Sequence, residues 1–234
     1  MARRDPELAV LEGFHALKHA LRFGAELLEA VANDPQELER LSEELAPDLA
    51  GSLATRVTSV EAEVLAELAP QATRTGVVAI ARRPRIDLAT VLADKRSAPL
   101  VLLEDPRTMG NMGACVRVAA AADAAGVLTT GDNDPWHPDA LRGGAGLHFA
   151  LPVARVEGLP DGDRPLVAID PGGEDLRPGA LPPRAILAFG TERYGLSTEL
   201  LDRADVRLGI PMREGVSSLN LATAVAAVLF SQRL

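Results

Sequence analysis

The sequence contains very little cysteine and few aromatic residues. Cys115 is the single cysteine in 234 residues, which excludes an internal disulfide and any cysteine cluster for zinc. A chain without disulfides is expected in the cytoplasm by default. Aromatic residues make up 3% of the chain and hydrophobic residues 47%, so a sizeable core has to be built mainly from Ala, Val and Leu.

Long apolar runs are also missing. No stretch approaches the roughly 20 consecutive apolar residues that a membrane-spanning helix needs, so we expect no membrane partner. The opening MARRDPELAV contains arginines but lacks the apolar segment and the cleavage site of a secretory signal. We therefore expect no signal peptide.

Positive charge is in short supply as well. The net charge of −9 argues against a protein that coats nucleic acid through its overall charge. Two segments, ARRPRID and DKRSAP, are nevertheless locally basic, and their cationic residues are Arg82, Arg83, Arg85, Lys95 and Arg96, with Arg107 close behind. These side chains form either a nucleic-acid-binding patch or a solvated domain junction, and the sequence leaves both interpretations open.

The first part of the chain has a mostly helical pattern. Apolar spacing predicts helices in ELAVLEGFHALKHALRFG, PQELERLSEEL and VTSVEAEVLAELA, although the first residues of the first segment equally fit a short strand. GVVAIA, residues 76–81, is typical of a buried strand. Proline and charged residues follow. We place a domain boundary near Lys95, which gives domains at residues 1–95 and 96–234.

After this boundary, short apolar runs alternate with helical segments. The expected strands are residues 99–105, 125–131, 165–170, 185–190 and 206–212. The expected helices are residues 112–125, a piece around 138–144, residues 197–204 and residues 217–234. This alternation predicts an α/β fold with a largely parallel sheet that helices cover on both faces.

Ligands of open α/β sheets bind at the carboxyl ends of the strands, and the first loop expected there is EDPRTMGNMG, residues 104–113. Its glycines allow a tight turn and a close approach to a ligand, and Asn111 offers both donors and an acceptor. Arg117 follows on a helix of small apolar residues. We expect it to face the same cleft as Asn111, where a guanidinium suits a phosphate or a developing oxyanion. The alternative is a surface arginine.

The second loop, FGTERYGLS, places Glu192 between Gly190 and Gly195, which favours a backbone that wraps a polar ligand. The third, IPMREGVSSLNLATA, leads into the last helix, where Ser217 or Ser218 is the expected cap and Asn220 falls in the first turn. Beyond Asn220 this helix is apolar all round, which predicts burial on every side and a subunit interface.

Other well-known site patterns are missing from the sequence. GxSxG, HExxH, GxxxxGK[ST] and GxGxxG do not occur. His15 and His19 are spaced to share a helix face, but no carboxylate or third histidine joins them, so a surface pair is the better interpretation. We expect no metal.

In this order and spacing, the three loops resemble the motifs of the SpoU/TrmH family of RNA ribose 2′-O-methyltransferases, within the SPOUT superfamily. NMGACVR is similar to the first motif, FGTERYGLS to the second and IPMREGVSSLNLATA to the third. This resemblance covers residues 99–234. VLEGFHALKHAL and GVVAIA resemble, more faintly, the L30e-like substrate-binding domain that precedes the catalytic domain in several members.

The resemblance implies a C-terminal α/β trefoil-knot (SPOUT) domain after a smaller α+β L30e-like domain, and a homodimer that packs through the last helix. It implies S-adenosyl-L-methionine (AdoMet) as the cofactor, held largely by main-chain groups of the second and third loops. By motif position, the residues expected to line the cofactor site are Gly190, Thr191, Ile210, Met212 and Leu219.

The resemblance also implies roles toward the RNA. Arg117 would bind the phosphate next to the target ribose and stabilise the forming alkoxide, and Asn111 would position the ribose or phosphate. The remaining residues of the expected catalytic set are Glu192, Ser218 and Asn220. The expected contacts to substrate RNA are Arg82, Arg83, Arg85 and Arg107.

The leading hypothesis is an AdoMet-dependent RNA 2′-O-ribose methyltransferase that acts on rRNA or tRNA, in a housekeeping or a resistance role. The alternative is a non-catalytic RNA- or ribosome-binding protein that keeps the SPOUT fold, which the complete set of candidate catalytic residues disfavours. A third hypothesis, another nucleotide-using α/β enzyme, lacks a phosphate-binding loop.

Overall fold

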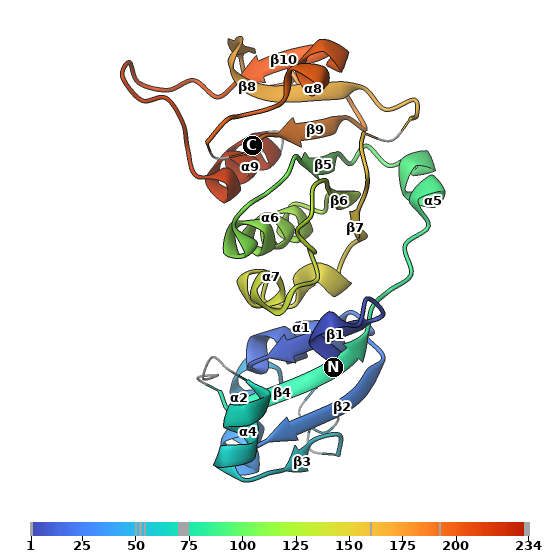
Figure 1. The fold of residues 1–234 in the computed structure, drawn as a ribbon, viewed down its shortest axis with the longest axis vertical. Coiled ribbons are helices and arrows are strands. Elements are labelled where there is room, and N and C mark those ends of the chain that lie inside the picture. Colours follow the sequence, from blue (N-terminus) through green and yellow to red (C-terminus); the bar gives the residue numbers. More distant parts are fainter. Residues whose placement is uncertain are drawn as a thin grey trace. The chain divides into compact units, whose positions relative to one another are not determined.

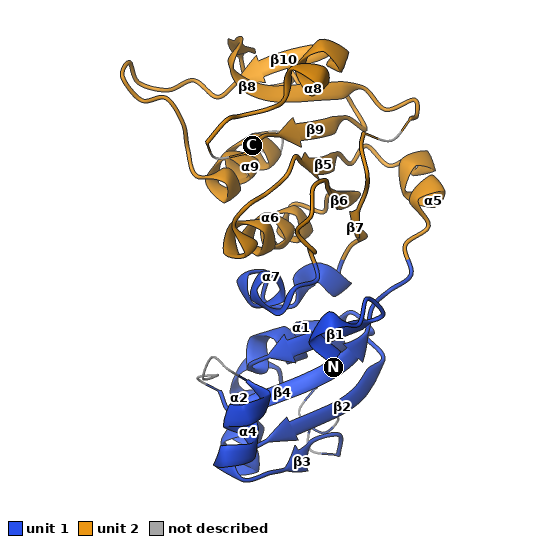
Figure 2. Ribbon diagram, viewed as in Figure 1, with its two compact units in different colours: residues 1–85, 136–150 blue, residues 86–135, 151–234 orange. Residues whose placement is uncertain are grey.

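The structure is a computed structural model, and it describes residues 2–49, 51, 53, 55–69, 75–159, 161–191 and 193–231. The chain divides into two compact units, Met1–Arg85 with Trp136–Ala150 and Ile86–Pro135 with Leu151–Leu234 (Figure 2). The first unit thus ends before the boundary predicted near Lys95. The reason is that the helix after Arg85 packs into the apolar core of the second unit through Val91.

The first unit is built on a four-stranded sheet with the order β1-β4-β2-β3 (Figure 1). Its strands are β1 (Leu8–Glu12), β2 (Leu27–Ala32), β3 (Thr58–Ser59) and β4 (Val77–Arg82). β4 pairs antiparallel with β1 and β2, and β2 pairs parallel with β3. Its helices are α1 (Phe14–Arg22), α2 (Pro35–Leu45), α4 (Ala62–Leu68) and α7 (Pro138–Gly143), with the 3-10 helices η1 (Ala2–Arg4) and η2 (Leu147–Phe149).

Local sequence explains where these elements begin. Asp34 caps α2 by accepting a hydrogen bond from the backbone N–H of Glu37 at 2.9 Å, and Pro35 occupies the first turn. The first residues of the segment ELAVLEGFHALKHALRFG form the strand β1, as the alternative interpretation predicted. Gly13, with a φ of 90°, separates β1 from α1.

The segment 136–150 packs tightly within the first unit. The buried carboxylate of Glu12 at the end of β1 pairs with Arg3 at 2.5 Å and with Arg142 of α7 at 2.6 Å. Gly146 has a φ of 75°, and a Cβ there would lie 2.3 Å from the carbonyl oxygen of Ala16 in α1. α7 and its loop are therefore part of the first unit's packing, held by a buried charge and by a backbone approach that only glycine allows.

The second unit has a six-stranded sheet with the order β10-β8-β9-β5-β6-β7, in which every neighbouring pair is parallel (Figure 1). Its strands are β5 (Leu100–Leu103), β6 (Gly126–Thr129), β7 (Val153–Arg155), β8 (Leu166–Asp175), β9 (Ile186–Phe189) and β10 (Val206–Gly209). Its helices are α5 (Leu88–Ala93), α6 (Met109–Ala121), α8 (Thr198–Arg203) and α9 (Leu221–Phe230). The predicted α/β fold with a parallel sheet is confirmed.

Helices cover both faces of this sheet. On one face, Val91 of α5 and Leu200 of α8 join a core with Leu100 and Leu102 of β5. Side chains alternate along a strand, so Val101 and its neighbours point to the other face, where α6 and α9 pack against each other (Figure 1). Among the described residues, no helix is both long and apolar enough to cross a membrane.

Arg164 holds α5 against the rest of the second unit. Its side chain is buried, with the residue 6% exposed, and its guanidinium donates hydrogen bonds at 3.0–3.2 Å to main-chain carbonyl groups. The accepting carbonyls belong to Val91, Leu92, Asp94, Ala98 and Arg184. These include the last carbonyls of α5, which have no partner inside the helix and favour a positive charge.

Candidate functional site

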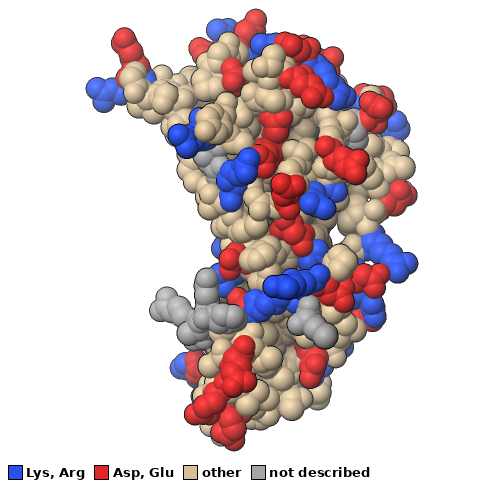
Figure 3. Space-filling view, viewed as in Figure 1, with Lys and Arg blue, Asp and Glu red and all other residues tan. Residues whose placement is uncertain are grey.

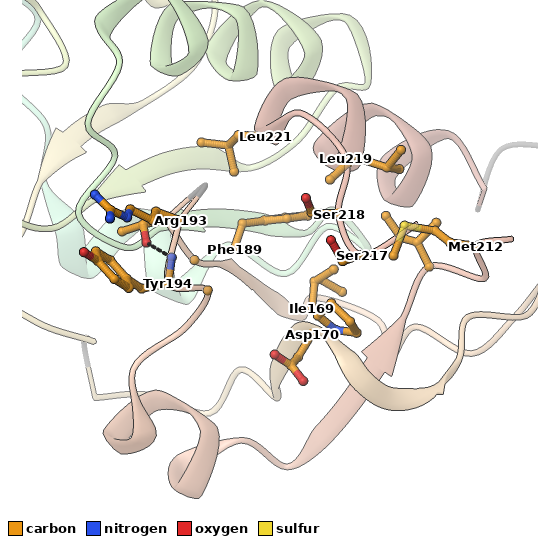
Figure 4. A pocket seen from close by; sticks show the side chains of 16 residues that line it. Ile169, Asp170, Phe189, Arg193, Tyr194, Met212, Ser217, Ser218, Leu219 and Leu221 are labelled. Atoms are coloured by element: carbon orange, nitrogen blue, oxygen red, sulfur yellow. Dashed lines mark hydrogen bonds between the residues drawn. The ribbon is translucent and has the colours of Figure 1, made fainter. Parts of the chain in front are cut away.

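A cavity of about 390 Å³ lies beside β8, at the carboxyl ends of β9 and β10 and against the start of α9 (Figure 4). This is where ligands of open α/β sheets bind, and the volume falls within the range of small-molecule sites. All of the residues expected to hold the cofactor line this cavity, namely Gly190, Thr191, Ile210, Met212 and Leu219. Residues from two separate loops thus meet around one space.

The cavity is mostly apolar, with few charged groups. Phe189 and Leu221 are buried in its wall, and Ile169 contributes from β8. Asp170 and Arg193 are the charged side chains among the described residues that line it. Such a lining suits a ligand that is largely apolar and carries a few polar groups.

The main chain after β9 comes unusually close to itself at Gly190. A Cβ at this position would lie 2.0 Å from the carbonyl carbon of Gly195. Thr191 and Gly195 exchange two backbone hydrogen bonds of 3.0 Å, and Gly195 adopts a φ of 69°. The two glycines are therefore required by the backbone geometry of the loop that forms this wall of the cavity.

Asn220 caps α9, so the prediction of a helix that starts at Ser217 or Ser218 was wrong. The Asn220 side-chain oxygen accepts hydrogen bonds from the backbone N–H groups of Ala222 and Thr223, at 3.0 and 3.4 Å. The α-helix begins only at Leu221. Ser218 precedes the helix, in a segment without regular secondary structure, and lines the cavity. Serine and asparagine cap helices about equally well, so local sequence did not decide between them.

α6 also begins elsewhere than predicted. It starts at Met109, so Asn111 and Gly113 lie inside the helix rather than in the loop before it. Neither Gly110 nor Gly113 has a positive φ, and in the 104–113 segment that conformation belongs to Asp105, with a φ of 43°. The predicted glycine turn is therefore absent from this segment.

Arg117 does not lie where we expected it in a single chain. Its side chain is exposed on α6, is not among the residues that line the cavity, and makes no hydrogen bond or ion pair with the described residues. The reason is helical geometry, because six residues separate it from Asn111 and steps of 100° place the two on different sides of the helix. Asn111 does reach the α9 side, where its side-chain oxygen accepts a hydrogen bond of 3.1 Å from Asn220.

The other expected site residues divide into two groups. Glu192 lies outside the residues that the structure describes. Three of the arginines proposed for RNA pair with carboxylates, Arg82 with Glu26, Arg85 with Glu7 and Arg107 with Asp105. Arg83 donates to the main-chain carbonyl of Leu8 at 2.6 Å. Figure 3 shows basic and acidic side chains intermixed on the face that it presents.

Sequence reasoning did not single out some residues of the cavity, in particular Asp170, Arg193 and Tyr194. Signals for them exist. Asp170 ends the strand predicted at 165–170, so it falls at the carboxyl end of a parallel strand, and the other two lie between the glycines of the second loop.

In the single chain α9 is buried on one side only, so the predicted burial on every side requires the subunit interface that was predicted with it. Val225 and Val228 are buried, whereas Thr223, Ala227 and Phe230 are exposed. These exposed residues recur at the spacing of one helix face. They leave a largely apolar stripe uncovered by the described residues.

The model of the SpoU rRNA Methylase family matches residues 98–230 of this sequence. The chain belongs to this family. A relative described as an uncharacterised tRNA/rRNA methyltransferase of Synechocystis sp. is 30% identical over 99% of this chain and 85% of its own. The 23S rRNA (adenosine(1067)-2′-O)-methyltransferase of Streptomyces azureus is 26% identical over 97% of this chain and 87% of its own length.

Solved structures of SpoU proteins agree with this assignment. The SpoU methyltransferase AviRb of Streptomyces viridochromogenes, crystallised with AdoMet, matches with a TM-score of 0.75 and 25% identity. The match covers 95% of this chain and 88% of AviRb, so it includes both compact units. The family predicted from the three loops is confirmed.

Proposed function

We propose that this SpoU family protein is an AdoMet-dependent RNA 2′-O-ribose methyltransferase that acts on rRNA or tRNA. The observation that carries the proposal is that all five expected cofactor residues meet around one cavity. Relatives named as rRNA 2′-O-methyltransferases along nearly the whole chain support the reaction type.

The residues present fit AdoMet as the cofactor. Gly190 leaves main chain rather than side chain facing the ligand, and the apolar wall from Phe189 and Leu221 suits an adenine ring. Asp170 and Arg193 offer opposite charges to a ligand that itself carries an amino-acid group. When bound, AdoMet supplies a methyl group on a positively charged sulfonium.

The protein's own groups have to orient the ribose and stabilise its oxygen as the 2′-hydroxyl loses a proton. Arg117 serves this step by binding the adjacent phosphate and holding positive charge near the forming alkoxide. The Arg117 side chain is exposed and pairs with no carboxylate among the described residues. Its guanidinium is therefore available to bind a phosphate. Asn111 and Asn220 hold the starts of α6 and α9 together beside the cavity.

A second copy of the chain completes the site. The exposed stripe of Thr223, Ala227 and Phe230 on α9 fits a homodimer that packs through this helix. α6 packs against α9, so such a dimer carries Arg117 of each copy toward the partner. Sedimentation of the purified protein tests this step, and a monomer at micromolar concentration would contradict it.

The first unit is proposed as the L30e-like RNA-binding domain, with Arg82, Arg83 and Arg85 as contacts and Arg107 as a further contact in the second unit. Exposed ion pairs contribute little to the stability of the fold. RNA phosphates can therefore replace the carboxylates that pair with Arg82, Arg85 and Arg107. An RNA substrate and a chain with one cysteine both fit the cytoplasm.

Two measurements test the proposed function. Mapping ribose methylation across total RNA from cells with and without the protein should reveal a lost site, and no lost site would count strongly against an enzyme. Arg117→Ala should abolish methyl transfer while the affinity for S-adenosylhomocysteine, measured by calorimetry, stays within about twofold. Arg40→Ala, at an exposed arginine of α2, is the control and should keep full activity.

A further inference from the structure

The loop after β9 presents the single tyrosine of the chain at the rim of the cavity. Tyr194 is 78% exposed, whereas Phe189 on the same strand–loop unit is 2% exposed. The guanidinium carbon of Arg193 lies 5.3 Å from the centroid of the tyrosine ring. In Figure 4 these two side chains lie together on one side of the cavity, away from Met212 and Leu219 on the other.

Described residues on both sides of the ring are joined by hydrogen bonds. Thr191 and Gly195 exchange two backbone hydrogen bonds, and the Thr191 hydroxyl accepts a third, of 3.0 Å, from the backbone N–H of Tyr194. Arg193 covers part of the ring, and no other ring or cation contact is found for Tyr194 among the described residues. A large aromatic surface is therefore carried by hydrogen-bonded residues and left open to solvent.

We propose that the Tyr194 ring, backed by Arg193, is a stacking platform for an unpaired base of the RNA substrate, next to the ribose that is methylated. This inference rests on the proposed function. A ribose that enters the cavity has to leave a continuous helical stack, so a base beside it loses a stacking partner. Exposed aromatic rings and arginine planes are the groups with which proteins replace that partner, independently of base identity.

The adenine of AdoMet is the other ring that Tyr194 could contact. The exposure of Tyr194 argues against it, because a cofactor ring is expected against the enclosed wall formed by Phe189, Gly190 and Leu221. The platform therefore faces the side from which the RNA approaches.

The test compares Tyr194→Ala and Tyr194→Phe with the unchanged full-length protein. The probe is a fluorescein-labelled oligoribonucleotide of twelve adenosines, and its control is an abasic ribose-phosphate chain of the same length. Both are titrated by anisotropy with S-adenosylhomocysteine present. Tyr194→Ala should weaken binding of the adenosine probe about tenfold, while Tyr194→Phe stays within about twofold. Binding of the abasic probe and of S-adenosylhomocysteine should not change.

The proposal is overturned by any of the following four results. Equal binding of the two probes by the unchanged protein, or Tyr194→Ala binding adenosines normally, means that no base stacks there. Tyr194→Phe as weak as Tyr194→Ala assigns the effect to the hydroxyl group, and a parallel loss of S-adenosylhomocysteine assigns the ring to the cofactor. If methyl transfer is never found but the tyrosine-dependent binding persists, the proposed function fails and the platform stands.

Discussion

The side-chain amide of Asn220 donates a hydrogen bond of 3.1 Å to the side-chain oxygen of Asn111, although 109 positions separate them in sequence. The same Asn220 side chain caps α9 through its oxygen. One residue thus sets the start of α9 and holds it to the start of α6, beside the wall of the cavity.

Two substitutions of Asn220 separate these contributions. Asn220→Ala removes both the cap and the link, so the free energy of unfolding should fall by about 1 kcal/mol. Asn220→Asp keeps the capping oxygen and loses the donor, so stability in urea should stay close to normal while methyl transfer falls. Equal activity of Asn220→Asp and the unchanged protein would show that the link to Asn111 has no catalytic consequence.

Gly190→Ala should remove cofactor binding. The added Cβ would lie 2.0 Å from the carbonyl carbon of Gly195, so the loop has to move away and reshape the cavity wall. We expect at least about a tenfold loss in affinity for S-adenosylhomocysteine by calorimetry. Gly158→Ala is the matched control, because a Cβ there meets nothing within 4 Å, and its affinity should be unchanged.

Glu12→Ala should destabilise the first unit strongly. The Glu12 side chain is 2% exposed and pairs with both Arg3 and Arg142, so its removal takes one buried carboxylate away from two arginines at once. Breaking such a pair lowers the free energy of unfolding by about 3 kcal/mol. Urea unfolding of Glu12→Ala and of the unchanged protein measures this loss. Glu7→Ala is the control, because its partner Arg85 is 95% exposed and lies 3.6 Å away. A loss in Glu7→Ala as large as in Glu12→Ala would contradict the assignment to burial.

The stability of the first unit should fall in mild acid because of His19. Burial lowers the pKa of His19 below 6.5, against the opposing effect of its hydrogen bond of 2.7 Å to the Ala145 carbonyl. Below pH 6.5 the unfolded chain then binds more protons than the folded chain, so the free energy of unfolding decreases until the folded pKa is passed. His19→Asn should lessen the difference in stability between about pH 8 and pH 5. An NMR titration that gives His19 a pKa above 6.5 would falsify this.

The strands of the second unit were predictable because each is a short apolar run with a turn after it. All five strands expected after residue 99 are present. β7 was missed because it spans only Val153–Arg155 at the edge of the sheet and is partly exposed. β2 was missed because Glu29 and its neighbours give it no clear alternation. In both, pairing with a neighbouring strand determines the structure, and the local pattern carries little of that information.

That the expected cofactor residues lie around one cavity could be predicted from the motifs, whereas the direction of Arg117 could not. Glycine spacing in the second loop reflects backbone geometry, which local sequence encodes directly. The direction of Arg117 depends on which side of α6 faces the sheet, and α6 is so rich in small apolar residues that its sequence marks no clear polar face. The start of α9 was similarly ambiguous, because Ser217, Ser218 and Asn220 are all capping residues.

The allocation of α7 and η2 to the first unit has a consequence for dissecting the protein. The polypeptide passes from one unit to the other at residues 85, 135 and 150, so no single cleavage yields two intact halves. A fragment cut at residue 95 would lack Arg142 and Gly146 and would expose the side of α1 on which that loop rests. The RNA capture proposed for the first unit and the methyl transfer proposed for the second are better separated by surface substitutions than by truncation.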